Sequence, residues 1–453
     1  MKSPSRDTPV SGEAPTVDDP QRLIDGAPMS MRQAAAVAVL IALNALDGFD
    51  VLAISFAAPG IAEEWGIGKG RLGIVLAMEL VGMGLGSMLL GGVADRLGRR
   101  RTILSCLILM VAGMGASSQA MGIVSLSVWR IVTGLGIGGM LASTTACAAE
   151  LSNERYRSLS VSWVAIGYPI GAVVGGTIAA ILLEHFDWRS VFVLGAGMTA
   201  LSIPLVLALV PEPVAWLCQK RPDGALQRVN ATLTRLGHAT VAALPERSGG
   251  QRAATMRDLL TGRLRIGTIL VAAAYFAHIT TVYFLLKWLP KISVDLGMSA
   301  SEGASMLVSA NIGGTIAGLI FGVATRFVPL PALVIGVMFG SAATVAALGA
   351  VEADITRMTG LAVAAGFFSS AGTVGMYATF ARTFPVSVRG FGTGFAIGIG
   401  RGGAVLSPML TGALFEAGLS LGFVAPLLGA GSLVAALALL VLWSAERRSP
   451  VPT

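Results

Sequence analysis

Long apolar stretches follow one another along almost the whole chain. A helix that crosses the hydrocarbon core of a bilayer needs about 20 such residues, and twelve stretches reach or approach this length. We predict the first six helices near 33–58, 72–93, 102–120, 126–149, 158–183 and 190–210. We predict the second six near 266–288, 303–324, 331–350, 359–381, 390–415 and 421–443. The pattern therefore indicates an all-α, polytopic membrane protein of 12 transmembrane helices.

The polar segments divide the chain into two halves. A polar, arginine-rich stretch at 211–265 separates an N-terminal six-helix half (33–210) from a C-terminal one (266–443). We interpret this stretch as a cytoplasmic linker that contains some helix, and residues 1–32 and 444–453 as cytoplasmic tails. The N-terminal tail is polar and lacks the apolar core of a signal peptide.

Composition supports the membrane assignment and excludes other classes. The chain is 54% hydrophobic and 13% charged, whereas soluble domains carry about 25% charged residues. The net charge of +7 does not indicate nucleic-acid binding, because the basic residues lie between apolar segments and form no separate basic domain. The three cysteines fall in predicted helices or on the cytoplasmic side, so they imply no disulfide framework.

The distribution of positive charge predicts the orientation, because Lys and Arg resist translocation. With both termini in the cytoplasm, most of the 32 Lys and Arg residues lie on the inside. The outside segments then hold only Lys69, Arg71, Arg189, Lys287, Lys291 and Arg357. We therefore expect a multi-pass protein of the inner (plasma) membrane with both termini in the cytoplasm.

Two further patterns bear on how the halves are built. Residues 157–171 and 389–403 align, with Arg157 opposite Arg389 and Gly171 opposite Gly403, and internal repeats of this kind underlie many secondary transporters. Glycines also recur every four residues in three predicted helices, at Gly167, Gly171 and Gly175, at Gly314, Gly318 and Gly322, and at Gly390, Gly394, Gly398 and Gly402. Each set makes a smooth helix face that either packs closely against a neighbour or lets helices rock against each other.

An acidic pair in the first predicted helix is the strongest chemical signal. Asp47 and Asp50 lie near the middle of the apolar stretch, where a charge costs about 2.5–3.5 kcal/mol. Positions three apart share a helix face, and Asn44 extends the polar stripe, so we expect it to face a wet cavity. Burial and a neighbouring like charge favour the protonated form of a carboxyl group. The pair is therefore a candidate proton-coupling site, although structural pairing with an arginine is the alternative.

Two arginines inside predicted helices are candidate partners. Arg130 lies in the fourth helix and Arg401 in the eleventh, where glycines flank it and leave room. A guanidinium group in a cavity can hold a carboxylate through two hydrogen bonds. Either arginine could bind an anionic substrate or neutralise the Asp pair, and the flanking glycines favour Arg401 for the substrate.

The loop between the second and third predicted helices carries the most specific motif. Residues 91–101 read Gly-Gly-Val-Ala-Asp-Arg-Leu-Gly-Arg-Arg-Arg, which resembles the signature loop of the major facilitator superfamily. The resemblance implies that Asp95 caps a neighbouring helix and, with Arg96, latches the cytoplasmic side. A plain basic loop would explain the arginines alone. The expected second copy at 322–326 has Thr325 in place of the acid, which implies a weaker latch in that half.

Other motifs narrow the resemblance to the aromatic acid:proton symporter family. They are Asp47-Gly48-Phe49-Asp50, Gly167-Tyr168-Pro169, Trp288-Leu289-Pro290 and the run from Gly392-Thr393-Gly394 to Arg401 and Pro408. The family's acidic pair maps to Asp47 and Asp50, and its eleventh-helix arginines map to Arg389 and Arg401. The resemblance implies proton-coupled uptake of an aromatic carboxylic acid of benzoate, hydroxybenzoate or lignin-derived type. It implies no cofactor beyond the proton gradient, no enzymatic activity and a monomer.

Several residues give weaker predictions. His278 and Tyr168 are candidate substrate-site residues, and His278 is also a candidate for the proton path. Glu79 is a second intramembrane acid, and the remaining aromatic candidates for ring stacking are Trp163, Tyr275 and Tyr283. Each of these residues can equally be a packing residue. The repeat also places Glu150, Glu154 and Arg157 opposite Arg382 and Arg389 as cytoplasmic gate pairs, unless these residues form a solvated loop.

Three alternatives to this function stay open. The same fold could carry another small organic acid or a sugar, and residues 211–217 (Pro-Glu-Pro-Val-Ala-Trp-Leu) resemble a sugar-porter motif. A drug:proton antiporter is the second, although Gly167-Tyr168-Pro169 departs from the usual efflux motif. A membrane receptor or enzyme is the third, and we find neither a metal-spaced His/Cys set nor a nucleophile triad that would support it.

Overall fold

The computed structural model describes residues 19–245, 255–261, 264–351 and 354–448, and within them the secondary structure is helical throughout. The first half contains α2 (Met31–Trp65), α3 (Lys69–Leu97), α4 (Arg99–Ser118), α5 (Ile123–Leu151), α6 (Glu154–His185) and α7 (Arg189–Leu209). The second contains α11 (Leu264–Asp295), α12 (Ala300–Ala324), α13 (Leu330–Ala347), α14 (Ile355–Thr383), α15 (Arg389–Glu416) and α16 (Leu421–Arg448). The short helices are α1 (Pro20–Gly26), α8 (Val214–Lys220), α9 (Ala225–Leu236), α10 (Met256–Leu260) and the 3-10 turn η1 (Leu348–Ala350).

Eleven helices among the described residues are long and apolar enough to cross a membrane. The twelfth long helix, α15, is not among these eleven, and it carries Arg401 and many glycines. Most helices extend beyond the predicted apolar stretches. In α2, for example, Ser30 and Gln33 form a capping box at the start and Gly66 ends the helix in a left-handed conformation. The helix continues through Pro59 and ends at Trp65, seven residues beyond the end of the predicted stretch at residue 58.

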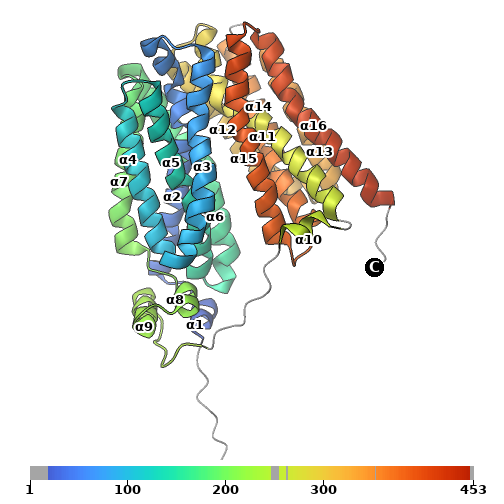
Figure 1. Ribbon diagram of the computed structural model, residues 1–453. Coiled ribbons are helices and arrows are strands. Elements are labelled where there is room, and N and C mark those ends of the chain that lie inside the picture. The colour runs from blue at the N-terminus through green and yellow to red at the C-terminus, as the bar shows by residue number, and fades with distance from the viewer. Residues whose placement is uncertain (1–18, 246–254, 262–263, 352–353, 449–453) are drawn as a thin grey trace, which may run out of the picture.

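The two halves have the same internal arrangement, as the predicted pseudo-repeat requires. In each half the first helix packs on the fifth, the second on the fourth, and the third on the sixth. These pairs are α2–α6, α3–α5 and α4–α7 in the first half, and α11–α15, α12–α14 and α13–α16 in the second. The fold is thus two six-helix pseudo-repeats, and Figure 1 shows them as two bundles side by side.

The two bundles converge at one end. We call the end that holds the α2–α3 connection the outer end, following the orientation predicted from the charges. There Lys69 pairs with Asp295 at 2.7 Å, the backbone N–H of Gly70 donates to Glu416 at 3.1 Å, and Ser301 donates to Glu184 at 3.0 Å. Towards the other end, where α1, α8 and α9 lie, the ribbons of the two bundles diverge (Figure 1).

The three glycine sets differ in how they pack. On α6, an added Cβ at Gly167, Gly171 or Gly175 would collide with Ile41, Ala45 or Phe49 of α2, so this set does provide a close helix contact. On α15, by contrast, Gly390, Gly394 and Gly398 have no atom within 4 Å of an added Cβ. Gly318 and Gly322 on α12 are open in the same way. Close packing therefore explains the α6 set but not the α15 set.

The α2–α6 contact gives a direct stability prediction. A Cβ at Gly171 would lie 1.7 Å from the carbonyl oxygen of Ala45, so Gly171→Ala must push the two backbones apart. Overpacking of this kind costs about 1–3 kcal/mol. We expect the purified Gly171→Ala protein to unfold at a temperature several degrees lower. Gly197→Ala on α7 is the matched control, since nothing lies within 4 Å there, and an equal change in both variants would contradict the prediction.

Candidate functional site

Five charged side chains are buried in the part of the chain that the structure describes. They are Asp47 and Asp50 on α2, Glu79 on α3, Arg130 on α5 and Lys287 on α11. Four of them come from the first half and Lys287 from the second. Buried charges are rare in proteins and stay buried only where they are paired or serve a function. We therefore treat this set of five residues, the buried charge cluster, as the candidate functional site.

Glu79 connects the cations of this cluster. Its carboxylate lies 2.5 Å from Nη2 of Arg130 and 3.5 Å from Nζ of Lys287. Arg130 also donates from Nη2 to the backbone carbonyl of Asp50 at 3.0 Å, and its guanidinium group lies over the ring of Phe192. Glu79 is thus the acid that Arg130 pairs with, whereas the sequence offered the Asp pair as the partner.

Lys287 requires a correction. The sequence placed it among the positive charges outside the membrane, because the apolar stretch ends close by at residue 288. In the structure α11 continues to Asp295, and Lys287 is fully buried with Nζ 2.5 Å from the carbonyl oxygen of Val51. Its lysine neighbour Lys291, one turn further out, pairs with Asp295 as expected for a residue near the surface.

Asp47 and Asp50 differ from the other members because their carboxylates are unpaired. All four carboxylate oxygens are buried, and none has an ion pair or a hydrogen bond of ordinary geometry, although Arg130 and Thr199 lie close enough to interact with Asp50. The two side chains are 2% and 0% exposed, and that of Asp50 lies beside Gly195 on α7. In this conformation the stripe therefore does not face the wet cavity that we expected. Asn44, three residues before Asp47 in α2, donates to the carbonyl oxygen of Val164 on α6 at 2.5 Å.

The charges of the cluster do not balance when every group is ionised. Glu79, Asp47 and Asp50 supply three negative charges, whereas Arg130 and Lys287 supply two positive ones. An uncompensated charge in a dry interior is strongly unfavourable. One proton on either aspartate makes the cluster neutral.

Arg401 lies between the two halves, further from the outer end of the molecule than Lys287. Its Nη1 donates to the carbonyl oxygen of Met83 on α3 at 2.6 Å, and the side chain is only partly buried. Tyr275 and Tyr283 of α11 are close enough to interact electrostatically with it. The hydroxyl of Tyr275 in turn lies 3.3 Å from that of Tyr377 on α14.

Tyr168 belongs to the same region but comes from the first half. It comes from α6 and interacts electrostatically with Tyr283, Tyr377 and Glu79. The structure thus brings Tyr168, Tyr275, Tyr283 and Arg401 into one neighbourhood at the boundary between the halves. Trp163 is exposed on α6, five residues before Tyr168. A cation with several tyrosines suits a ligand that carries both a negative charge and an aromatic ring.

His278 lies elsewhere, inside the second half. Its Nδ1 is 2.9 Å from the hydroxyl of Ser432 and its Nε2 is 3.0 Å from the carbonyl oxygen of Ser369. Because a carbonyl oxygen only accepts, Nε2 must carry a hydrogen, and in the neutral ring Nδ1 then accepts from Ser432. Ser341 bonds to both serine hydroxyls. In this conformation His278 therefore joins α11 to α13, α14 and α16 and does not reach Arg401.

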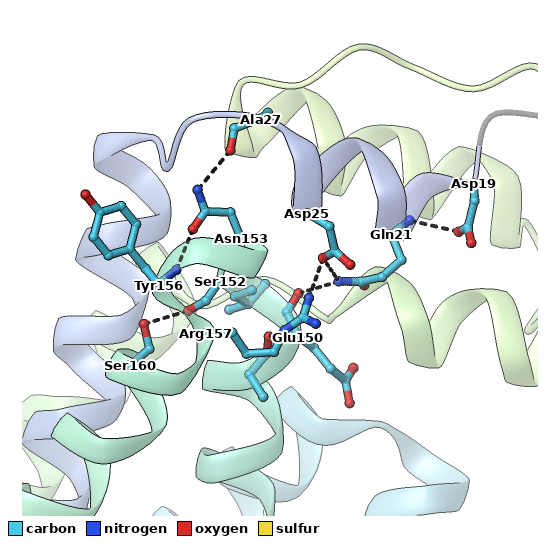
Figure 2. Close-up of polar contacts among 12 residues, drawn as sticks. Asp19, Gln21, Asp25, Ala27, Glu150, Ser152, Asn153, Tyr156, Arg157 and Ser160 are labelled. Carbon is cyan, nitrogen blue, oxygen red and sulfur yellow. Dashed lines mark hydrogen bonds and ion pairs between the residues drawn. The ribbon is translucent and has the colours of Figure 1, made fainter.

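In this conformation the described contacts of the predicted gate residues Glu150, Arg157 and Arg389 stay within one half each. Figure 2 shows Arg157 paired with Asp25 of α1, and Gln21 of α1 donating to the carbonyl oxygen of Glu150 at 3.4 Å. On the other side, Arg389 donates to the carbonyl oxygen of Phe384 at 3.3 Å. The N-terminal helix α1 thus holds the ends of α5 and α6, where we expected the basic residues of the second half.

The signature loop is described only in part. The side chain of Asp95 lies outside the described residues, so its predicted capping and latching role stays a prediction, and Arg96 is exposed. Glu154 is exposed in the first turn of α6 and Arg382 lines a small pocket with Thr379 and Trp443.

Glu212 has a role in this region that the sequence analysis did not predict. Its Oε1 accepts the backbone N–H groups of Arg99 at 2.5 Å and Arg100 at 3.2 Å, and so caps α4. Gly98, with φ of +106°, makes the turn that aims these donors at the carboxylate. Burial raises the pKa of Glu212, and its two N–H donors oppose that shift. Three arginines at a helix N-terminus are unfavourable for the helix dipole, and that signal could have suggested an acidic cap.

Comparisons with known proteins agree with this architecture. The family model described as Major Facilitator Superfamily matches residues 40–351. The 4-hydroxybenzoate transporter PcaK of Pseudomonas putida is 30% identical over 86% of this chain and 87% of its own length. The gallate transporter of the same organism is 29% identical over 96% of this chain and 98% of its own length. An inward-open structure of the xylose transporter XylE from E. coli matches with a TM-score of 0.69 at 17% identity, over 91% of this chain and 95% of that one.

The family match and the curated relatives make this chain a membrane transporter and not an enzyme. The chain belongs to the major facilitator superfamily, as the match over most of its length shows. The predicted kinship with the aromatic acid transporters is confirmed by the curated relatives. The likeness to XylE, at 17% identity, confirms the fold alone.

Proposed function

We propose that this protein takes up an aromatic carboxylic acid together with a proton, by alternating access. The observation that carries the proposal is the buried charge cluster, in which two unpaired aspartates leave one negative charge too many. Such a cluster favours one bound proton, and the proton has a place to bind on Asp47 or Asp50. These two residues are the proposed proton-coupling site.

The proposed substrate follows from the partly exposed arginine at the boundary between the halves. Arg401 supplies a positive charge for a carboxylate, and Tyr168, Tyr275 and Tyr283 supply aromatic surface for a ring. The curated relatives carry names such as gallate, 4-hydroxybenzoate and benzoate transporter. The residues around Arg401 and the names of the relatives both favour an aromatic acid of about the size of benzoate or gallate.

The proposed cycle uses the two ends of the molecule in turn. From outside, a proton neutralises one aspartate while the acid anion binds near Arg401, and the two halves then close at the outer end. Contacts such as Lys69–Asp295 and Gly70–Glu416 suit that closed outer end. On the inside the substrate and the proton leave, and Asp95, Arg96, Glu150 and Arg389 are the proposed gate that closes this side for the return.

The proposed setting is the inner (plasma) membrane, with both termini in the cytoplasm. It is supported by the excess of positive charge in the segments on that side. The proposed division of the chain keeps the halves at 33–210 and 266–443, with 211–265 as linker. We propose that a monomer is the working unit, because each chain contains both halves.

Transport by proteoliposomes that contain the purified protein tests the proposal. With an acidic outside, we expect labelled 4-hydroxybenzoate or gallate to accumulate inside, while a dye in the lumen reports proton entry in step with uptake. Glucose should not enter. Uptake that ignores the pH difference would contradict proton coupling, and uptake of glucose but of neither acid would contradict the proposed substrate class.

A further inference from the structure

We propose that Lys287 is a second carboxylate-binding residue of the transport path. While the two halves are in contact at the depth of Lys287, the carboxylate of Glu79 occupies the position on Lys287 that the substrate would take. This inference rests on the proposed function, because it concerns how the acid anion enters. When the halves part at the outer end, the carboxylate of the substrate replaces Glu79 on Lys287. The anion then continues inward to Arg401.

The geometry of Lys287 makes its bonds depend on the contact between halves. Lys287 belongs to α11 of the second half, and both of its polar partners belong to the first half. They are the carbonyl oxygen of Val51, 2.5 Å from Nζ, and Oε2 of Glu79, 3.5 Å from Nζ. Separation of the halves at this depth therefore breaks both interactions at once.

The consequences for the two partners are unequal. Glu79 keeps a close ion pair of 2.5 Å with Arg130, and both of these residues lie in the first half. Lys287 keeps no such partner, and a cation in a partly dry cavity without a counter-ion is unfavourable. An arriving carboxylate is the group that satisfies it, so the structure assigns the vacated position to an anion rather than to a cation or a neutral sugar.

The surroundings also suit an aromatic acid. Tyr283 lies one helical turn inward of Lys287, four residues away on the same face of α11. Tyr283 interacts electrostatically with both Glu79 and Arg401. At a rise of 1.5 Å per residue, Lys287 lies about 12 Å from the outer end of α11 at Asp295. Arg401 lies about 22 Å from the outer end of α15 at Glu416, by the same rise. Tyr283 thus lies between two cations at successive depths.

The test is a comparison of the two faces of the membrane. Counterflow of 4-hydroxybenzoate, which needs no proton gradient, is measured in right-side-out and inside-out vesicles. For Lys287→Gln we expect KM at the outer face to rise at least tenfold, and KM at the inner face to change less than twofold, because Glu79 covers Lys287 when the inner side is open. Lys287→Arg should restore much of the outer affinity.

Glu79→Gln separates the proposal from a purely structural role of the ion pair. Without its internal competitor, Lys287 should bind the outer substrate more tightly, so KM at the outer face should fall severalfold. Lys291→Gln, one turn away on the same helix, is the matched control and should behave as wild type, since Lys291 pairs with Asp295 of its own helix. The yield and the size-exclusion profile of each variant show that it folds.

Each outcome decides between the claims. If Lys287→Gln and Glu79→Gln each lose affinity equally at both faces, the ion pair has only a structural role. If the outer-face KM of Lys287→Gln is unchanged, Lys287 is not part of the transport path. If the proposed function is wrong, the result is different: the wild-type protein shows counterflow but does not accumulate the substrate under a pH gradient. Wild-type protein that exchanges neither 4-hydroxybenzoate, gallate nor benzoate would overturn both proposals.

Discussion

Replacement of Asp47 or Asp50 by Asn is expected to abolish accumulation of the substrate against its gradient. With one proton per monovalent anion, a difference of one pH unit can sustain about tenfold accumulation, since one pH unit corresponds to about 1.4 kcal/mol. An amide can neither take up nor release that proton, so it keeps the buried charge cluster permanently neutral. The accumulation ratio should therefore fall from about tenfold to about one.

The measurement is uptake of labelled 4-hydroxybenzoate into proteoliposomes under an imposed pH difference. Exchange of labelled for unlabelled substrate should survive in the Asn variants, because it needs no net proton movement. Asp223→Asn is the control, as Asp223 is exposed in the turn between α8 and α9, away from the cluster. Full accumulation by both Asp47→Asn and Asp50→Asn would show that the proton binds elsewhere.

The second large effect is expected for Arg401→Ala. Loss of one member of a hydrogen-bonded charge pair costs about 2–5 kcal/mol in a binding site, and the lower limit corresponds to a rise in KM of about 30-fold. Arg401 is partly exposed while it bonds to Met83. We therefore expect KM to rise at both faces of the membrane, in contrast to the one-sided effect of Lys287→Gln.

Concentration-dependent uptake in oriented vesicles checks this expectation. Arg401→Lys should recover only part of the affinity, because an ammonium group cannot form the planar pair of hydrogen bonds that a guanidinium group forms with a carboxylate. Arg357→Ala is a suitable control, since Arg357 is largely exposed and forms its ion pair with Asp354, three residues away on the same helix end. A wild-type KM for Arg401→Ala would leave Tyr168 and Lys287 as the remaining candidates for holding the acid.

Much of the fold follows from the sequence, because the bilayer imposes one strong rule on every spanning segment. Apolar length alone predicted the twelve helices, and the aligned segments that begin at Arg157 and Arg389 predicted the repeat. The helix ends were less predictable. Capping residues such as Ser30 and the continuation of α11 beyond Lys287 depend on contacts outside the apolar stretch.

The site was predicted only in part, for a physical reason. A buried charge can be recognised in one helix, which is why Asp47, Asp50, Glu79 and Arg130 were all noticed. Its partner cannot, because ion pairing depends on how distant helices pack: Glu79 and Lys287 are separated by 208 positions in the chain. Periodicity likewise places the two aspartates on one face of α2 but does not reveal which neighbouring helices that face meets.

The open glycine face of α15 has a consequence for anyone who wishes to stabilise this protein for biochemical work. A glycine inside a helix costs about 0.5–1 kcal/mol relative to alanine, and at Gly390, Gly394 and Gly398 no contact in this arrangement offsets that cost. Alanine at these positions would therefore raise the melting temperature of the arrangement seen here. If another arrangement needs a bare helix face there, the same substitutions would trap the carrier, and the most heat-stable variant would be the slowest one.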